Sequence, residues 1–326
     1  MPALPPTSSL PDREGLPDRE GLPEDERAAQ EAWRARYAPG VEEIIPRRVV
    51  PSPVFSAVVL GHDADDSLVA CLQHLRGQTL RGELPYEILL VDNGGLDHLR
   101  ARTAPLCDVE IRLPPGTPVS QARNTAVAWA RGEHVAVIDD DGLVAPTFLE
   151  VALRTFQDPS IAAMRGRVLP REHPYYCTLA GHYDRGDALI DDALVTEGHM
   201  AIRRRVHLLS GGFPDQVFGH EGICLTYRIH SAFPAQRVVY VPELLMRHDY
   251  IDGARKFVAK SRRYRDIERL VTDAEGGDAF RDYLAAHFAK RMPAAPLPLD
   301  RKVARALLKA ARFVIQRAPA WALPSR

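Results

Sequence analysis

Three consecutive carboxylates follow a short apolar run near the middle of the chain. Val-Ala-Val-Ile occupies 135–138, Asp139-Asp140-Asp141 comes directly after it, and Gly142 follows. The apolar run is typical of a strand that is buried on both faces of a parallel sheet. Because Asp139 and Asp141 are two residues apart, an extended chain directs both carboxylates to one side, where they could share a hard cation. An acidic turn in water is the alternative interpretation.

Two further polar positions could serve a nucleotide. Asp92-Asn93 follows an apolar run at 87–91, and a carboxylate there could hydrogen-bond a nucleobase, although Asp-Asn-Gly-Gly is also an ordinary turn sequence. Arg123 lies in the first turns of a helix expected over 119–131, close to the positive helix end, where it could meet a diphosphate. A solvated arginine is the alternative for this position.

The elements that must position these residues alternate between strands and helices from residue 54 onward. We expect four strands and two helices in this order, at 54–60, 67–78, 87–91, 109–113, 119–131 and 134–138. Strand–helix–strand alternation with short loops indicates right-handed crossovers and a mainly parallel sheet. Ligands of such sheets bind beyond the carboxyl ends of the strands, which is where Asp92 and Asp139 are expected.

The flanking segments differ from this central part. Residues 1–23 are rich in proline and charge and contain Leu-Pro-Asp-Arg-Glu-Gly twice in succession, which predicts disorder. Residues 24–37 are expected to form one polar helix that ends at Pro39-Gly40. We therefore expect an N-terminal segment that is disordered and partly helical, an α/β domain and a helical C-terminal extension, at 1–50, 51–250 and 251–326.

Composition narrows the class of protein. Of the 326 residues, 45% are apolar and 26% are charged, as in an ordinary globular chain, and the net charge of −1 gives no reason to expect a nucleic-acid partner. The four cysteines lie far apart without metal-finger spacing, which fits a reducing compartment. With no signal-peptide pattern and no run of about 18 apolar residues, we expect a cytoplasmic protein.

A series of motifs in this order resembles glycosyltransferase family 2, whose members have the GT-A fold. The resemblance covers about residues 54–250, and its blocks lie at 56–63, 71–79, 87–95, 121–126, 130–141, 198–204, 211–213, 219–228 and 239–248. It implies a Rossmann-like, mainly parallel mixed sheet flanked by helices. It also implies transfer of a sugar from a nucleotide-diphosphate-sugar donor to an acceptor.

The resemblance implies roles for the polar residues at the strand ends. Asp63 and Asp92 match positions that contact the nucleotide base, Arg123 lies near the ribose and diphosphate, and Asp139-Asp140-Asp141 matches the Asp-x-Asp motif. The donor-binding residues that we predict are therefore Asp63, Asp92, Asn93, Arg123, Asp139 and Asp140.

The same resemblance implies a metal site. The last Asp of the Asp-x-Asp motif coordinates a divalent cation that bridges the diphosphate, and His248 matches a position that is a metal ligand in some members. Mg²⁺ or Mn²⁺ would neutralise the charge that grows on the leaving group, and an imidazole ligand favours Mn²⁺. The predicted metal ligands are Asp139, Asp141 and His248.

The chain departs from the family at the catalytic base. Inverting members carry Glu-Asp before a Leu-x-x-Arg helix, and the Asp deprotonates the acceptor hydroxyl. Leu225 and Arg228 set the register here, so Gly222 occupies the Asp position. Glu221 is our candidate base, and His199 is a weaker alternative because imidazole titrates near neutrality. We expect an inverting transferase; the alternatives are a retaining transferase without an enzymic base and a non-catalytic nucleotide-sugar-binding module.

The acceptor and the partners are less well marked. Residues 165–197 form the section that usually shapes acceptor choice in this family, and a glycan, a lipid-linked molecule or a small molecule would fit. Two C-terminal segments are basic: 254–270 carries seven basic residues against two acidic ones, and 300–326 carries seven against one. These helices either contact anionic lipid on the inner face of the membrane, or pack on the domain or in a homodimer. We favour packing.

Overall fold

The apolar runs of the sequence form the central strands of one sheet. The structure is a computed structural model that describes residues 24–80, 84–215, 219–263, 275–290 and 292–317. Within these residues the sheet has ten strands, in the order β1-β4-β3-β2-β5-β9-β7-β10-β6, with β8 paired to β10. The four strands expected from the sequence are all present, as β2 (Phe55–Gly61), β3 (Tyr86–Asp92), β4 (Val109–Arg112) and β5 (His134–Asp139).

The parallel half of the sheet brings the predicted site residues to one edge. Strand β2 pairs in parallel with both β3 and β5, and β3 pairs in parallel with β4. In this register Gly61 lies opposite Asp92, and Leu60 lies opposite Asp139. The carboxyl ends of β3 and β5 therefore flank the end of β2, as the strand–helix alternation predicted.

The other half of the sheet contains both parallel and antiparallel strands. Its pairing brings the three carboxylates close to His248, which is far from them in the sequence. Strand β9 (His199–Arg203) is antiparallel to β5 and to β7 (Ile161–Leu169), and β7 is parallel to β10 (Arg237–Arg247). The short β6 (Leu143–Val144) returns against the end of β10, with Leu143 opposite Arg247. The chain that follows the three carboxylates is thereby held beside His248. Strand β8 (Ile190–Asp191) pairs antiparallel with the first part of β10, with Asp191 opposite Val239.

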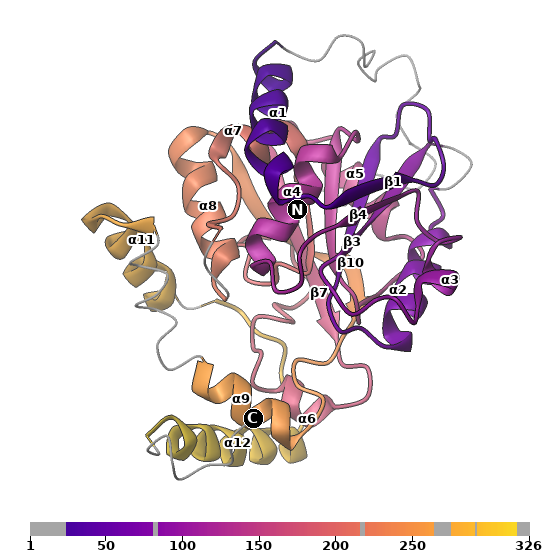
Figure 1. The fold of residues 1–326 in the computed structure, drawn as a ribbon. Coiled ribbons are helices and arrows are strands. Elements are labelled where there is room, and N and C mark those ends of the chain that lie inside the picture. The colour runs from indigo at the N-terminus through magenta and orange to yellow at the C-terminus, as the bar shows by residue number, and fades with distance from the viewer. Residues whose placement is uncertain (1–23, 81–83, 216–218, 264–274, 291, 318–326) are drawn as a thin grey trace.

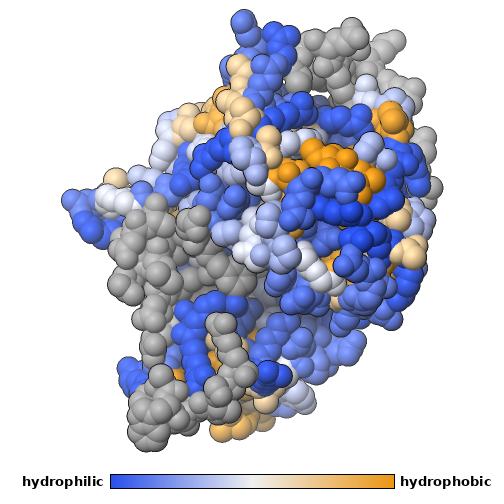
Figure 2. Space-filling model, viewed as in Figure 1, coloured by the Kyte–Doolittle hydropathy of each residue, from blue (hydrophilic) through white to orange (hydrophobic). Residues whose placement is uncertain are grey.

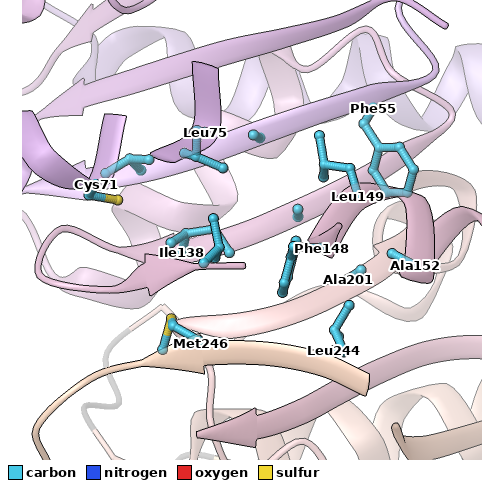
Figure 3. Packing of buried hydrophobic residues seen from close by; sticks show 14 of the residues in the cluster. Phe55, Cys71, Leu75, Ile138, Phe148, Leu149, Ala152, Ala201, Leu244 and Met246 are labelled. Carbon is cyan, nitrogen blue, oxygen red and sulfur yellow. The ribbon is translucent and has the colours of Figure 1, made fainter. Parts of the chain in front are cut away.

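Helices cover both faces of the sheet, so the central strands are buried on both sides (Figure 1). Phe55, Ala57 and Val59 of β2 belong to one core cluster, whereas Val58 belongs to a second cluster on the opposite face. Figure 3 shows the first cluster, in which Phe148 and Leu149 pack near the strands. The covering helices include α2 (Asp66–Arg76), α3 (Arg100–Thr103), α4 (Val119–Trp129), α5 (Phe148–Thr155), α7 (Arg204–Ser210) and α8 (Glu221–Ala232). The short α6 (Pro174–Cys177) lies at the lower end of the molecule, beside the C-terminal helices (Figure 1).

The N-terminal helix that we expected to precede the domain packs onto it. Helix α1 (Glu24–Tyr37) leads through η3 (Ala38–Gly40) to β1 (Glu43–Pro46), which pairs with β4. Half of its buried side chains are polar, and the other half are aromatic: Trp33 and Tyr37 pack in the second core cluster. Gln30 donates to the carbonyl oxygens of Ala128 and Ala130, and Glu26 forms a buried ion pair with Arg204. This mixture of polar and aromatic side chains gives no clear apolar stripe in the sequence, so the expectation of one polar helix did not include its packing onto the domain.

The C-terminal extension is helical, as expected. It contains α9 (Ala254–Arg263), α11 (Asp278–Ala289) and α12 (Leu299–Arg317). Figure 1 shows α9 and α12 together at the lower end of the molecule. The end of the basic segment 254–270 and the repeated hexapeptide lie outside the described residues. Within those residues, none of the helices has the length and apolar character needed to cross a membrane.

Candidate active site

The guanidinium of Arg123 is buried beside the carboxyl ends of the parallel strands. Arg123 of α4 is only 5% exposed, and its two terminal nitrogens donate to different carboxylates: Nη2 to Oδ1 of Asp139 at 2.9 Å and Nη1 to Oε1 of Glu221 at 3.0 Å. Burial opposes the charge, but Asp139 and Glu221 outweigh it, so the pKa of Arg123 is raised. Arg123 thus ties β5 to the start of α8, and the solvated alternative does not apply.

Asp141, the last of the three carboxylates, pairs with His248, which directly follows β10. Oδ1 of Asp141 lies 3.0 Å from Nε2 of His248, and the other ring nitrogen, Nδ1, lies 2.9 Å from the hydroxyl of Tyr183. Burial disfavours both charged forms. The pairing outweighs it, lowering the pKa of Asp141 and raising that of His248. The hydroxyl of Tyr183 can accept a hydrogen bond from Nδ1–H, and Nε2 is then directed at Asp141.

The three carboxylates therefore have different environments. Asp139 is held by Arg123 and Asp141 by His248. Asp140 is partly buried, and burial together with the charges of Asp141 and Asp139 raises its pKa to about 7. An added positive charge at this edge would relieve the repulsion among them.

The arrangement of Asp141 and His248 is compatible with a divalent cation, for which the protein would supply only some of the ligands. Among the described residues, no group of three His, Cys, Asp or Glu side chains converges as a ready metal site. Asp141 and His248 offer two ligand atoms 3.0 Å apart. This is the separation of neighbouring ligands that each lie about 2.1 Å from an octahedral ion. Such an ion commonly takes one or two protein ligands and completes its shell with substrate phosphates and water.

The predicted base-binding residues gather at the ends of β2 and β3. Asp92 is buried and accepts from the backbone of Gly94 at 3.0 Å and from Arg100 at 3.2 Å. Asn93 donates to the carbonyl oxygen of Thr117 at 2.8 Å, while its own Oδ1 is buried without a hydrogen-bond partner. Asp63 is exposed and has a positive φ of 48°. The exposed carboxylate of Asp63 is an acceptor that donors of a nucleobase could reach, whereas Oδ1 of Asn93 is covered in this structure.

A pocket of about 140 Å³ opens between the strand ends and α9. Predicted residues line it, among them Arg123, Asp139, Glu221 and His248. It is smaller than the roughly 300–1,000 Å³ of sites that enclose a whole ligand, so it suits the reacting end of a donor and not an entire nucleotide sugar. Three side chains that the sequence did not single out for a role also line it: Tyr183, Glu197 and Lys260.

His199, the weaker of the two candidate bases, is wholly buried on β9. Its ring packs 5.3 Å from the ring of Phe148, and neither ring nitrogen has a hydrogen-bond partner. Burial lowers the pKa of His199 to about 3, with Arg165 and His248 adding to the shift. A histidine in this environment stays neutral at physiological pH and is a weak proton acceptor.

The surroundings of Glu221, the first candidate base, also differ from those expected of a general base. It begins α8, as the helix register predicted, but it is only 3% exposed. One carboxylate oxygen accepts from Arg123, and the other accepts from the backbone N–H of Gly219. With both oxygens engaged, Glu221 is placed to hold Arg123.

The structure gives a steric reason for Gly222. A Cβ atom at this position would overlap the carbonyl oxygen of Leu194 and would lie 2.9 Å from Oε1 of Glu197. The first turn of α8 thus packs directly against the backbone of the segment before β9. No aspartate fits here without moving that segment.

The carboxylate of Glu197 occupies the space beside Gly222. Its Oε1 accepts from the backbone N–H of Gly222 at 2.9 Å. Burial, followed by the charge of Glu221, raises the pKa of Glu197 to about 8, although Arg123 and the hydrogen bond from Gly222 act in the opposite direction. The sequence offered little to identify this residue, since a glutamate before Gly198-His199 has no distinctive spacing.

Comparison with known proteins agrees with this geometry. Residues 56–216 match the family model described as glycosyl transferase family 2. Among curated proteins, the chain is 27% identical over 116 residues to the glycosyltransferase GlyG of Streptococcus pneumoniae serotype 4, which covers 33% of this chain and 36% of that protein. The chain spans about a third of the length of the curated relatives it matches.

Solved structures show the same fold. The mannosyltransferase PcManGT of Pyrobaculum calidifontis, in complex with GDP-Man and Mn2+, aligns with a TM-score of 0.55 and 16% identity over 91% of this chain and 86% of that chain. S. aureus TarS 1–349, in complex with UDP-GlcNAc, aligns with a TM-score of 0.53 and 13% identity over 80% and 81%. The fold is that of the GT-A glycosyltransferases, and residues 56–216, just under half of the chain, carry the match to glycosyltransferase family 2.

Proposed function

We propose that the protein transfers a glycosyl group from a nucleotide-diphosphate sugar to an acceptor hydroxyl, with inversion at the anomeric carbon. The observation that carries this proposal is the strand-end arrangement of Arg123–Asp139 beside Asp141–His248. It combines a guanidinium, a cation-compatible pair of ligands and a pocket for the reacting end of the donor. The structural neighbours in complex with GDP-Man and Mn2+ or with UDP-GlcNAc support a donor of this class.

In this proposal Asp141 and His248 hold a divalent cation, Mn²⁺ or Mg²⁺. When bound, the cation would supply positive charge to the diphosphate leaving group. Arg123 stays with Asp139 near the ribose and the diphosphate. Lys260 of α9 also lines the pocket, where burial and the charges of Arg263 and Lys256 lower its pKa to about 7. The nucleobase lies against Asp63, Asp92 and Asn93.

We further propose Glu197 as the general base in place of the aspartate that Gly222 excludes. Its carboxylate lines the pocket beside the start of α8, next to where an aspartate on that helix would project. It takes the proton of the acceptor hydroxyl while the acceptor oxygen bonds to the anomeric carbon. The bond from that carbon to the diphosphate oxygen breaks in the same step. A carboxylate with a raised pKa is a stronger proton acceptor than an ordinary glutamate. Glu221 instead holds Arg123.

Glutamine substitutions separate the two glutamates. Glu197→Gln keeps the side-chain volume but cannot take a proton, so we expect kcat to fall at least about 100-fold with donor affinity unchanged. Glu221→Gln removes one charged partner of Arg123, so we expect weaker donor binding and a smaller loss in kcat. Steady-state kinetics and donor titration give both quantities, and Glu243→Gln on the exposed part of β10 is the matched control.

Three results would contradict this assignment. If Glu221→Gln loses turnover while Glu197→Gln keeps it, Glu221 is the base. If proton NMR of the first product shows retention of the anomeric configuration, the inverting reaction is excluded. If no nucleotide sugar is turned over by the unaltered protein while donors bind, the chain is a nucleotide-sugar-binding module.

The raised pKa of Glu197 predicts a pH dependence of stability. The pKa is about 8 in the folded protein and about 4.5 for an unperturbed glutamate. Between these values the folded state binds more protons than the unfolded state, so the contribution of Glu197 to the free energy of unfolding decreases as pH rises. Glu197→Gln should therefore match the unaltered protein near pH 5 and become relatively more stable toward pH 8. Urea unfolding at several pH values measures this; an equal offset at every pH would contradict it.

The metal assignment predicts how nucleotide binding stabilises the fold. UDP or GDP should raise the thermal midpoint more with Mn²⁺ than with EDTA, because a ligand that binds only the folded state stabilises it. Asp141→Asn should lose the Mn²⁺-dependent part of this shift, whereas Asp187→Asn, at an exposed carboxylate, should keep it. Equal shifts with Mn²⁺ and EDTA in the unaltered protein would refute the assignment.

A further inference from the structure

The outer face of α12 is apolar. Nine large apolar side chains of the described residues are strongly exposed, and five of them lie on this one helix. They are Leu299, Val303, Leu307, Phe313 and Val314, with exposed fractions from 52% to 76%. Figure 2 shows apolar side chains along the lower edge of the molecule, where α12 lies in Figure 1.

These side chains form a continuous stripe. Leu299, Val303 and Leu307 follow one another at four-residue spacing and Val314 is seven residues further on, so all four share one side of the helix. Leu308 and Ile315 point the other way and pack against the core. A helix that only covers a domain buries its apolar stripe and exposes its charges. Helix α12 packs through a smaller set of apolar residues and leaves the larger set outside.

Basic residues surround this stripe. Helix α12 carries six basic residues and one acidic residue, Asp300, and the neighbouring α9 carries five basic residues and no acidic ones. The whole chain has a net charge of only −1, so the positive charge is concentrated at this end. Lys302 and Lys309 lie along one side of the stripe on the exposed surface, where long side chains can reach lipid headgroups.

We propose that α12 binds the surface of a bilayer that contains anionic lipids, with the stripe of Leu299, Val303, Leu307 and Val314 inserted at the level of the headgroups. An exposed apolar stripe on a cationic helix has the two features of interfacial helices, namely apolar area to bury and attraction to anionic headgroups. A second copy of the chain is a poorer occupant, because it would bring the same concentration of positive charge against this one.

The surface is connected to the candidate active site through α9. Lys260 and Arg263 of α9 line the pocket, and α12 packs on α9. Binding through α12 would thus hold the pocket close to the bilayer. The binding itself does not depend on the reaction proposed for that pocket, so the two proposals fail separately.

Vesicle co-sedimentation tests this surface. The unaltered protein should bind vesicles of phosphatidylcholine with phosphatidylserine, bind vesicles of phosphatidylcholine alone more weakly, and lose binding as salt is added. The double substitution Leu307→Gln and Val314→Gln should lower the partition coefficient about 100-fold, since two apolar side chains no longer enter the bilayer. Glutamine is a good helix former, so α12 should stay helical.

Two controls isolate the stripe. Val49→Gln changes the most exposed of these apolar side chains, far from α12 in the sequence, and should leave vesicle binding unchanged. Glu197→Gln should also bind vesicles normally, because it alters only the pocket. Equal binding of the double variant and the unaltered protein would overturn the proposal, as would no binding to anionic vesicles at low salt. A dimer in sedimentation velocity that the double substitution dissociates would assign the stripe to a second copy instead.

Discussion

The buried guanidinium of Arg123 joins the two halves of the site. It contacts Asp139 at the end of β5 and Glu221 at the start of α8, so the strand-end edge and the helix that flanks the pocket are held by one side chain. Removing either carboxylate would leave a buried charge with fewer partners, which is costly in a protein interior. This need for two partners explains why Glu221 is engaged by Arg123. It is also why our proposal takes the base from another carboxylate that faces the pocket.

Close packing at Gly222 supports Glu197 as that carboxylate. The backbone before β9 approaches α8 so closely that no side chain fits at position 222, and Glu197 enters the adjoining space from the other side of that contact. The change of residue type at 222 and the position of Glu197 are therefore two consequences of one backbone contact. Such an exchange keeps a carboxylate at the pocket while moving it from a helix to a neighbouring loop.

Much of this architecture could be predicted from the sequence, and the parts that could not have physical reasons. The apolar runs that end at Asp92 and Asp139 predicted the parallel strands and their common edge, because burial on both faces demands such runs. The packing of α1 was not predicted, because only half of the side chains that it buries are apolar and the other two, Glu26 and Gln30, contact the domain through polar groups. Glu197 was missed because its role depends on a contact between segments far apart in the chain. Gly222 indicated that the aspartate of the family is absent, but it did not point to Glu197 as the replacement that we propose.

The most direct test of the central claim is to locate Mn²⁺ by anomalous scattering in crystals grown with UDP or GDP. We predict one Mn²⁺ peak in contact with Oδ1 of Asp141, Nε2 of His248 and oxygens of the diphosphate, with the nucleobase at the ends of β2 and β3. A nucleotide bound elsewhere, or one bound at this edge with no Mn²⁺ beside Asp141 and His248, would contradict the claim.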